Sequence, residues 1–598
     1  MSGIVGLLNS DGAPLDLALL TGMTAAMAFR GPDARNVWAD DRVGLGHTLF
    51  RTSVESEQER QPCTLGGDVW ITADARIDGS AALVQRLRER SREVSAGATD
   101  AELILHAYLV WGDHCLDHLI GDFAFVLWDG RQERLLAARD QLGVAQLFYA
   151  QAGGTLLVGN TLHSLLLHPR VPDTLDEQTL AEVALFLVTL DDAATGYSAI
   201  RRVPAGHKLT CERGGLRVER YWTLSEPARP LRYRRPAEYA EHFRMLFDEA
   251  VGDRLRTDRV GSQLSGGMDS SSIAVTAHRR LQANGQPFDL RAFSIEYPTL
   301  IHDEEGLLAA QVAAHSGFPV DVLNGETYLH AEPPAEPTWV PPEPGAATVW
   351  VMEEVCRRTA AFAPVLLTGY GGDPLLAPPE LSWHRVWAAL GQGSWKWPLR
   401  RLAARGRQRR RRQPDPLPAW VNGQWARDVE LADRASLFRQ WARGDQVGVA
   451  SAPLWRALFA WSDAGYNGRP LSIRFPFFDL RLLEFVLAIP PVPWLEDKRL
   501  LRAAMGERLP EGVRTRPKTL MPGDVTLEQQ KQAGVPGWQI DLLAAPEMAG
   551  YVDRQWLGAV HRATAVVQAE IWAKERPPVE LAYWLRHRPS WHRSAGAT

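Results

Sequence analysis

The sequence predicts two large domains: an α+β sandwich over residues 1–220, and an α/β domain with a helical C-terminal part over residues 221–598. The chain has 598 residues, which is too long for one hydrophobic core. Its first part carries many short apolar segments with few helices between them. The second part begins with the order strand, glycine loop, helix, strand, which indicates parallel strands joined by right-handed crossovers.

The strands expected in the first domain are short apolar segments bounded by turn residues. We expect them at Ile4–Asn9, Val43–Thr48, Val69–Ala73, Phe123–Asp129, Arg134–Arg139 and Leu156–Gly159. Apolar residues at helical spacing predict helices at Leu15–Phe29 and Asp100–Trp111. The composition changes at Tyr221–Arg235, where two prolines flank charged residues, so this segment is the expected linker.

The second domain is expected to alternate helices and strands before it becomes mostly helical. Its first elements are predicted as helices at Pro236–Arg256 and Ser270–Ala283 and strands at Val260–Leu264 and Leu290–Ile295. Proline-rich Ala331–Pro344 is predicted to be an extended loop, and the arginine run Arg400–Pro418 an exposed one.

Composition and charge exclude several classes of protein. The formal net charge is −5 and the pI is near 6.4, so the chain as a whole does not attract nucleic acid or anionic lipid. The four cysteines form no CxxC pair, which argues against a zinc site and a disulfide framework. The N-terminus lacks the pattern of a signal peptide, and no apolar run is long enough to span a bilayer. We therefore expect a cytoplasmic protein with no nucleic-acid partner.

A glycine-rich motif lies between a predicted strand and a predicted helix, at Leu264-Ser265-Gly266-Gly267-Met268-Asp269-Ser270-Ser271. Its glycines let backbone N–H groups approach phosphate oxygens, and the helix N-terminus adds partial positive charge. An anionic Asp269 among phosphate-binding groups makes sense as a ligand of Mg²⁺. The Walker pattern GxxxxGK[ST] is absent, and the motif is similar to the SGGxDS loop of ATP pyrophosphatases. The alternative, a glycine turn that merely starts a helix, does not explain the complete match.

A second acidic turn follows another apolar segment, at Leu366-Leu367-Thr368-Gly369-Tyr370-Gly371-Gly372-Asp373. Because ligands bind at the carboxyl ends of parallel strands, Asp373 is expected to face Asp269 across one site. Two carboxylates that share a metal ion would neutralise the charge of a pyrophosphate leaving group. This turn alone is weak evidence for a metal site. Together with the first motif it predicts a site with two carboxylates.

Further motifs extend over both domains. In the first they are Arg30-Gly31-Pro32-Asp33, Leu45-Gly46-His47-Thr48, Gly121-Asp122-Phe123-Ala124-Phe125 and Ala138-Arg139-Asp140. In the second they are Phe293-Ser294-Ile295, Asp303-Glu304, Arg474-Phe475-Pro476-Phe477-Phe478-Asp479, Lys498-Arg499-Leu500-Leu501-Arg502 and Arg516-Pro517-Lys518. With them the chain resembles the class B asparagine-synthetase superfamily. The resemblance implies an Ntn-type glutaminase-like sandwich, an ATP-pyrophosphatase domain of the adenine nucleotide alpha hydrolase type, ATP as co-substrate and Mg²⁺ as cofactor.

The chain departs from this family at the residues that make ammonia. Glutaminases of the family begin Met-Cys-Gly and use the cysteine as nucleophile, whereas Ser2 stands there in this chain. A serine hydroxyl is a far weaker nucleophile near neutral pH. The Asn-Gly-Glu stretch that holds glutamine is replaced by Asp74-Ala75-Arg76. We expect a first domain without glutaminase activity, with a weakly active serine glutaminase as the alternative. Ammonia is then not the nucleophile.

The second departure is Tyr370. Asparagine synthetases carry Ser-Gly-Glu-Gly in this turn, and Thr368-Gly369-Tyr370-Gly371 looks like the branch of β-lactam synthetases and lasso-peptide cyclases. In that branch the tyrosine is implicated in activating an amine of the substrate itself. Its partner in this chain is not assigned, and Glu380 and His384 are candidates. A packed aromatic side chain at a turn is the alternative.

The resemblance also implies roles for other residues. Lys518 aligns with the lysine that reaches the adenylate, where an ammonium stabilises charge in the transition state; a surface lysine is the alternative. Lys498 and Arg502 are expected on the pyrophosphate side or at a helix end. The implied ATP- and pyrophosphate-binding set is Leu264, Ser265, Gly266, Gly267, Asp269, Ser270, Ser271, Ile295, Thr368, Gly369 and Lys498, with Asp269 and Asp373 as metal ligands.

The chain is longer than expected for a β-lactam synthetase, with extra residues at 331–344 and 380–443. The second insertion carries tryptophans and arginines at Trp383, Trp387, Trp395, Trp397, Trp420, Trp425 and Arg400–Arg412. Such a surface suits a folded peptide or a partner protein. A solvated basic loop over ordinary core tryptophans is the alternative.

These observations favour a lasso-peptide macrocyclase that adenylates an Asp or Glu side chain of a precursor peptide and joins it to the N-terminal amine. A leader-binding protein and a leader peptidase are partners implied by the resemblance. The alternative is a β-lactam-synthetase-like or asparagine-synthetase-like ligase of a small amino acid. A tRNA-modifying pyrophosphatase would share the glycine loop without the first domain, and a non-catalytic scaffold would require Asp269 or Asp373 to be misplaced.

Overall fold

The computed structural model describes residues 1–95, 97–213, 215–225, 227, 230–329, 331–334, 336–345, 350–377, 417–441, 453–517 and 523–589. Several residues singled out above lie outside these ranges. They are Lys518, Glu380, His384, Arg400–Arg412 and four tryptophans, Trp383, Trp387, Trp395 and Trp397.

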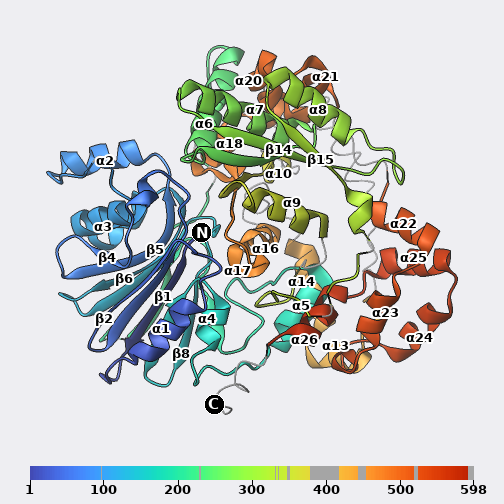
Figure 1. Cartoon of the computed structure of the whole chain (residues 1–598), viewed down its shortest axis with the longest axis horizontal. Helices are drawn as coiled ribbons and strands as arrows, with labels where there is room; N and C mark the ends of the chain where they lie inside the picture. Colours follow the sequence, from blue (N-terminus) through green and yellow to red (C-terminus); the bar gives the residue numbers. More distant parts are fainter. Residues whose placement is uncertain are drawn as a thin grey trace.

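The first domain is a sandwich of two antiparallel sheets, each with six strands (Figure 1). The first sheet has the order β10-β8-β9-β1-β3-β2, with β1 (Gly3–Asn9), β2 (Ala34–Asp40), β3 (Val43–Leu49), β8 (Phe148–Ala152), β9 (Thr155–Gly159) and β10 (Ile200–Arg202). The second has the order β12-β11-β7-β6-β5-β4, with β4 (Cys63–Thr64), β5 (Val69–Ile77), β6 (Gly121–Asp129), β7 (Arg134–Arg139), β11 (His207–Glu212) and β12 (Gly215–Arg220).

Helices cover the outer faces of the two sheets. Between the sheets, one apolar cluster joins Ile4 and Leu45 of the first to Val126 and Ala137 of the second. The outer side of the first sheet packs against α1 (Leu17–Ala25), α4 (Leu162–Leu166) and α5 (Glu177–Phe186), and that of the second against α2 (Ser80–Glu89) and α3 (Asp100–Trp111). All seven residues of β1 are buried because both faces of this strand are covered.

The predicted fold class is confirmed. Every strand expected in the first domain is present, and β7 and α3 have the predicted bounds. Six further strands were not predicted: the edge strands β2, β4, β10 and β12 and the interior strands β8 and β11. The reason is clearest for β2 and β12. Most side chains of both strands are exposed or only partly buried, so neither strand carries the apolar alternation that marks a strand in a sequence.

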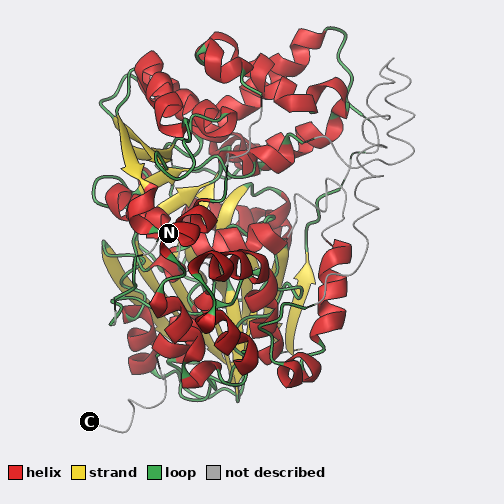
Figure 2. Ribbon diagram, turned by 90° about the vertical axis from the view of Figure 1, so that its right-hand side faces the viewer, coloured by secondary structure: helices red, strands yellow, loops and turns green. Residues whose placement is uncertain are grey.

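The second domain is built on a parallel sheet with the order β15-β14-β13-β16-β17. Its strands are β13 (Arg259–Gln263), β14 (Asp289–Glu296), β15 (Val320–Asn324), β16 (Val365–Leu367) and β17 (Ser472–Arg474), and its first helices are α6 (Pro236–Gly252), α7 (Met268–Ala283), α8 (Glu305–Ser316) and α9 (Trp350–Ala360). Figure 2 shows these strands enclosed by helices in the upper part of the molecule. Because β13 lies between β14 and β16, the loops after these three strands leave the sheet at the same edge.

The remaining described residues are mostly helical, and these helices contact both domains. Near the parallel sheet lie α10 (Gly372–Leu375), α16 (Pro453–Ser462), α17 (Ala464–Asn467), α18 (Leu480–Ala488), α19 (Pro491–Trp494), α20 (Arg499–Met505) and α21 (Glu511–Thr515). The remaining helices are α13 (Gly423–Asp428), α14 (Leu431–Trp441), α22 (Val525–Ala533), α23 (Gly537–Ala544), α24 (Arg554–Arg562), α25 (Ala565–Glu575) and α26 (Val579–His587). None of the described helices is long and apolar enough to cross a membrane.

Two tryptophans of the predicted aromatic insertion belong to the core. Trp420 and Trp425 are buried, and they share one apolar cluster with Trp584 of α26 and with Leu7 and Met23 of the first domain. These two side chains therefore join the helical part to the sandwich and do not form a peptide-binding surface.

Candidate active site

The glycine motif forms the turn from β13 into α7. Gly266 has φ +69°, and a Cβ there would lie 2.3 Å from Cβ of Leu308 and 2.9 Å from N of Ala309. Both the backbone conformation and the close approach of α8 therefore require glycine. The Oγ of Ser270 accepts a hydrogen bond from the backbone N–H of Ser265 at 3.1 Å and lies 3.1 Å from the Oγ of Ser265. These contacts brace the turn at the N-terminus of α7.

The second acidic turn lies directly against the first. A Cβ on Gly369 would lie 3.0 Å from the backbone N of Ser270, and one on Gly372 would lie 2.5 Å from Cγ of Asp269. Bare glycines thus allow the end of β16 to touch the start of α7. The two motifs, about a hundred residues apart in sequence, form one site, as the parallel order of their strands predicts.

One ammonium group joins the two acidic residues. The Nζ of Lys498 lies 2.5 Å from Oδ2 of Asp269 and 2.6 Å from Oδ1 of Asp373. Lys498 and the preceding Asp497 both have left-handed backbones, with φ of 53° and 47°. Consecutive non-glycine residues in this region are strained and are found where the surroundings fix them, often at functional sites.

These groups line a cavity of about 620 Å³ at the carboxyl edge of the parallel sheet. The predicted residues that line it are Leu264, Ser265, Gly266, Gly267, Asp269, Ser270, Ile295, Thr368, Gly369, Tyr370, Asp373 and Lys498. Ser271 does not line it, because its side chain is fully buried within α7. Lys518 is outside the described residues, whereas the preceding Arg516 and Pro517 line the cavity.

Tyr370 lies in the wall of this cavity with 40% of its surface exposed. Desolvation by the surrounding wall raises the pKa of the phenol above its usual value of 10, with a smaller contribution from Cys356. The hydroxyl is therefore neutral at physiological pH. It is suited to donating or accepting a hydrogen bond, and not to acting as a phenolate.

Several cavity residues had no role assigned from the sequence. Phe293, Met352 and Val355 supply an apolar wall, and the turn 302–305 supplies a polar one. Burial, with a smaller contribution from Asp303, raises the pKa of the Glu305 carboxyl to about 7. The Asp303-Glu304 motif after a strand was the only signal for this wall. Asp303 itself accepts hydrogen bonds from the backbone N–H groups of Tyr297 and Glu305, at 2.6 and 3.0 Å.

Arg502 organises the approach to the cavity. Its guanidinium donates to the carbonyl oxygens of Asp497 and Arg516, both at 2.7 Å, and to that of Arg514. It therefore ties the turn that carries Lys498 to the end of α21, from which the chain continues toward Lys518.

The donor set fits magnesium better than a transition metal. Asp269 and Asp373 offer carboxylate oxygens beside backbone N–H groups and hydroxyls that suit phosphate. Within the described ranges, no group of three or more His, Cys, Asp or Glu side chains is arranged to hold a metal. Mg²⁺ is commonly held by one or two carboxylates together with substrate phosphates, so two carboxylates in an open cavity are sufficient.

Two family models match the chain. The one described as a glutamine amidotransferase domain covers residues 1–222, and the one described as asparagine synthase covers residues 242–586. The chain belongs to the asparagine synthase family. This confirms the predicted superfamily.

Three relatives show how far the similarity extends. Glutamine-hydrolyzing asparagine synthetase 3 of Bacillus subtilis is 28% identical over 563 residues, which is 86% of this chain and 85% of that protein. Glutamine-hydrolyzing asparagine synthetase 2 of the same organism is 24% identical over 560 residues, covering 87% and 71%. Amidase chry2 of Gibberella zeae is 28% identical over 335 residues, covering 53% and 48%. This member of the asparagine synthase family is an ATP-dependent, amide-forming ligase.

The position of the family's glutaminase nucleophile is nearly closed in this member. Ser2 is 7% exposed, its backbone N–H donates to Oδ1 of Asp74 at 2.8 Å, and its Oγ accepts from the N–H of Phe50 at 3.1 Å. The cavity beside it measures about 30 Å³, and Met1 forms part of its wall. The Arg76 side chain at this cavity is held by Asp78 and Asp122, at 2.8 and 2.6 Å.

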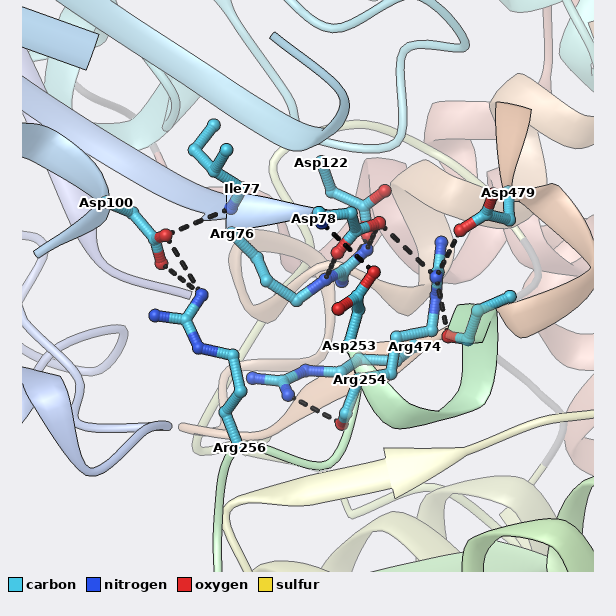
Figure 3. Close-up of polar contacts among 12 residues, drawn as sticks. Arg76, Ile77, Asp78, Asp100, Asp122, Asp253, Arg254, Arg256, Arg474 and Asp479 are labelled. Carbon is cyan, nitrogen blue, oxygen red and sulfur yellow. Dashed lines mark hydrogen bonds and ion pairs between the residues drawn. The ribbon is translucent and has the colours of Figure 1, made fainter. Parts of the chain in front are cut away.

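Buried ion pairs cross from this region into the synthetase domain (Figure 3). Arg254 lies 3.3 Å from Asp78 and 3.0 Å from Asp479, and Arg474 donates to the carbonyl oxygen of Arg254 at 2.7 Å. Further along the boundary, Arg30 makes two hydrogen bonds to Asp463, at 2.5 and 2.8 Å. Buried charged side chains of the glutaminase-like domain, Arg30 and Asp78, therefore bind charged residues of the synthetase domain.

Proposed function

We propose that this ligase is a lasso-peptide macrocyclase. It adenylates an Asp or Glu side chain of a precursor peptide and joins that carboxyl group to the N-terminal amine of the same peptide, releasing AMP and pyrophosphate. The observation that carries the proposal is the placement of Tyr370 beside Asp373 in the wall of an open cavity of about 620 Å³.

The source of the amine is the first argument. The Asn-Gly-Glu stretch that holds glutamine in the family is replaced by Asp74-Ala75-Arg76, and the Arg76 side chain is held by two aspartates. A serine hydroxyl also needs an adjacent base to become a useful nucleophile. Ammonia from glutamine is therefore a poor candidate, and an amine carried by the substrate takes its place.

The first chemical step is adenylation. A carboxylate oxygen of the peptide attacks the α-phosphorus of ATP, the bond from that phosphorus to the bridging oxygen breaks, and pyrophosphate leaves. Ser265, Ser270 and the N-terminus of α7 supply donors for the phosphate oxygens. Asp269 and Asp373 would hold Mg²⁺, which when bound neutralises charge on the leaving pyrophosphate.

The second step forms the amide. The amine nitrogen attacks the acyl carbon, the bond to the AMP oxygen breaks, and the amine proton passes to a base. Tyr370 stays protonated and orients the amine. The Glu305 carboxyl has a pKa of about 7, which is close to physiological pH, so Glu305 is suited to be the base that accepts this proton. Lys518 is proposed to stabilise the transition-state charge. Holding amine and acyl group in one molecule can contribute up to about 7–11 kcal/mol of barrier reduction when the two groups are aligned for attack.

The proposed setting is the cytoplasm, with a leader-binding protein and a leader peptidase acting on the peptide before cyclisation. Neither a nucleic acid nor a membrane takes part.

The test compares candidate substrates in the presence of ATP and Mg²⁺. Leader-free core peptides with a free N-terminus and an internal Asp or Glu are expected to lose one water, as measured by mass spectrometry, with AMP formed in equal amount. Acetylation of the N-terminus should stop amide formation while ATP–pyrophosphate exchange continues. Exchange with small amino acids and not with peptides would contradict the macrocyclase and favour a β-lactam-synthetase-like or asparagine-synthetase-like ligase.

A further inference from the structure

We infer that Lys498 competes with the magnesium ion for Asp269 and Asp373, so that metal and nucleotide enter this site together and not metal first. The inference rests on the proposed function for the identity of the metal site. It assigns to Lys498 a positioning role beyond contact with pyrophosphate.

The geometry places a cation where the metal would bind. The Lys498 ammonium lies within 2.6 Å of an oxygen of each carboxylate, and the side chains of Lys498 and Asp269 are 13% and 14% exposed. Charge-assisted hydrogen bonds of this length are the strong ones. A metal ion that binds the same carboxylates must displace the ammonium or lie close to it, and two cations so close repel one another.

The backbone keeps the lysine in this position. Lys498 and Asp497 are both left-handed, and the guanidinium of Arg502 holds the carbonyl oxygen of Asp497 at 2.7 Å. Lys498 also precedes α20, which packs on α6 in the core of the domain. The ammonium is therefore not on a freely moving surface side chain.

A bound triphosphate would end the competition between the Lys498 ammonium and the metal ion for the two carboxylates. Its β- and γ-phosphates bring negative charge to the same edge of the cavity, where the ammonium can pair with phosphate oxygens and release the carboxylates to the metal. Before that, Lys498 keeps Asp269 and Asp373 facing each other, because two carboxylates with no cation between them would repel. The lysine thus pre-organises the site and delays metal binding.

The experiment measures Mn²⁺ binding by the loss of the free-ion signal in electron paramagnetic resonance, with the full-length chain. Without nucleotide, Lys498→Met is expected to bind Mn²⁺ at least about tenfold more tightly than the wild type, since the methionine removes the ammonium and keeps an unbranched side chain only one atom shorter. With α,β-methylene-ATP present, the wild type should remove much more of the free Mn²⁺ signal than the same concentration of the analogue removes without protein. Equal or weaker nucleotide-free binding by Lys498→Met would overturn the inference.

Two controls locate the effect. Lys574→Met, at a lysine that is 82% exposed, should leave Mn²⁺ affinity unchanged. Adding Asp269→Asn to Lys498→Met should abolish the gain, and a gain that persists would contradict binding at these carboxylates. Thermal unfolding checks that each variant is folded. If Lys498→Met gains affinity but the wild type shows ATP–pyrophosphate exchange with small amino acids and not with peptides, the proposed function fails while this inference stands.

Discussion

Each of the two domains has a polar cavity. The cavities differ in whether their charged side chains are enclosed and paired within the protein or face open space. Beside Ser2, Asp74 binds the backbone of Ser2 and Arg76 binds two aspartates, around a space of about 30 Å³. In the synthetase domain, the ion pairs of Lys498 with Asp269 and Asp373 line a cavity of about 620 Å³, and the Asp373 side chain is 52% exposed. Charges that face open space can be exchanged for those of a substrate, whereas buried pairs such as Arg30–Asp463 and Arg254–Asp78 join the two domains.

The largest expected effect concerns the acids of the open cavity. Asp269→Asn and Asp373→Asn should each lower ATP–pyrophosphate exchange by about 10³-fold or more, because leaving-group charge is no longer neutralised. Lys518→Ala should likewise abolish product, as the resemblance implies. Asp258→Asn, at an exposed aspartate, is the matched control. Pyrophosphate exchange near the wild-type rate in Asp269→Asn or Asp373→Asn would show that the carboxylates of the open cavity do not act on the nucleotide.

The next effect concerns the enclosed pairs between the domains. Arg30→Met should lower the free energy of unfolding by about 3–5 kcal/mol, because Asp463 is left buried without its bidentate partner. Chemical denaturation measures this change. Arg213→Met, whose side chain is 88% exposed beside Glu133, should cost less than about 1 kcal/mol. Similar costs for both variants would show that the boundary ion pairs do not hold the domains together.

A smaller effect separates the two chemical steps. Tyr370→Phe should slow amide formation by about 10²-fold, since the hydroxyl that orients the amine is lost. Exchange of pyrophosphate should stay within about threefold of wild type, because adenylation does not use the phenol. Loss of both activities would place Tyr370 in nucleotide binding instead.

A still smaller effect is pH-dependent and belongs to the first domain. Burial raises the pKa of Glu59 from 4.5 to about 7. The folded state then holds this proton more tightly than the unfolded state, so stability falls as pH rises from about 4.5 to 7 and the loss is complete above 7. Glu59→Gln should therefore raise the free energy of unfolding at pH 8 by on the order of 2 kcal/mol, with little change at pH 4. An equal gain at both pH values would contradict the titration.

The smallest expected effect is none. Ser2→Ala should leave product formation unchanged in rate, measured with the same peptide and ATP. Dependence on glutamine, or loss of activity in this variant, would revive a serine glutaminase and remove the contrast between the two cavities.

The sequence predicted that the two acidic motifs lie together, but it did not predict half of the strands in the first domain. Both motifs directly follow parallel strands, and parallel strands end at the same edge of a sheet. The two motifs were therefore sufficient to predict that Asp269 and Asp373 lie close together. Ser271, the last residue of the glycine motif, was assigned to the nucleotide by the resemblance, but its side chain is buried in α7. The bridging position of Lys498 and the raised pKa of Glu305 depend on packing between distant segments, and no local pattern encodes them.

The most direct test follows an oxygen atom. A core peptide with ¹⁸O in its acidic side-chain carboxyl is converted with unlabelled ATP, and the released AMP is analysed by mass spectrometry. Adenylation followed by attack of the tethered amine predicts one ¹⁸O in each AMP and a product that has lost one labelled oxygen. Unlabelled AMP beside cyclised peptide would contradict the account.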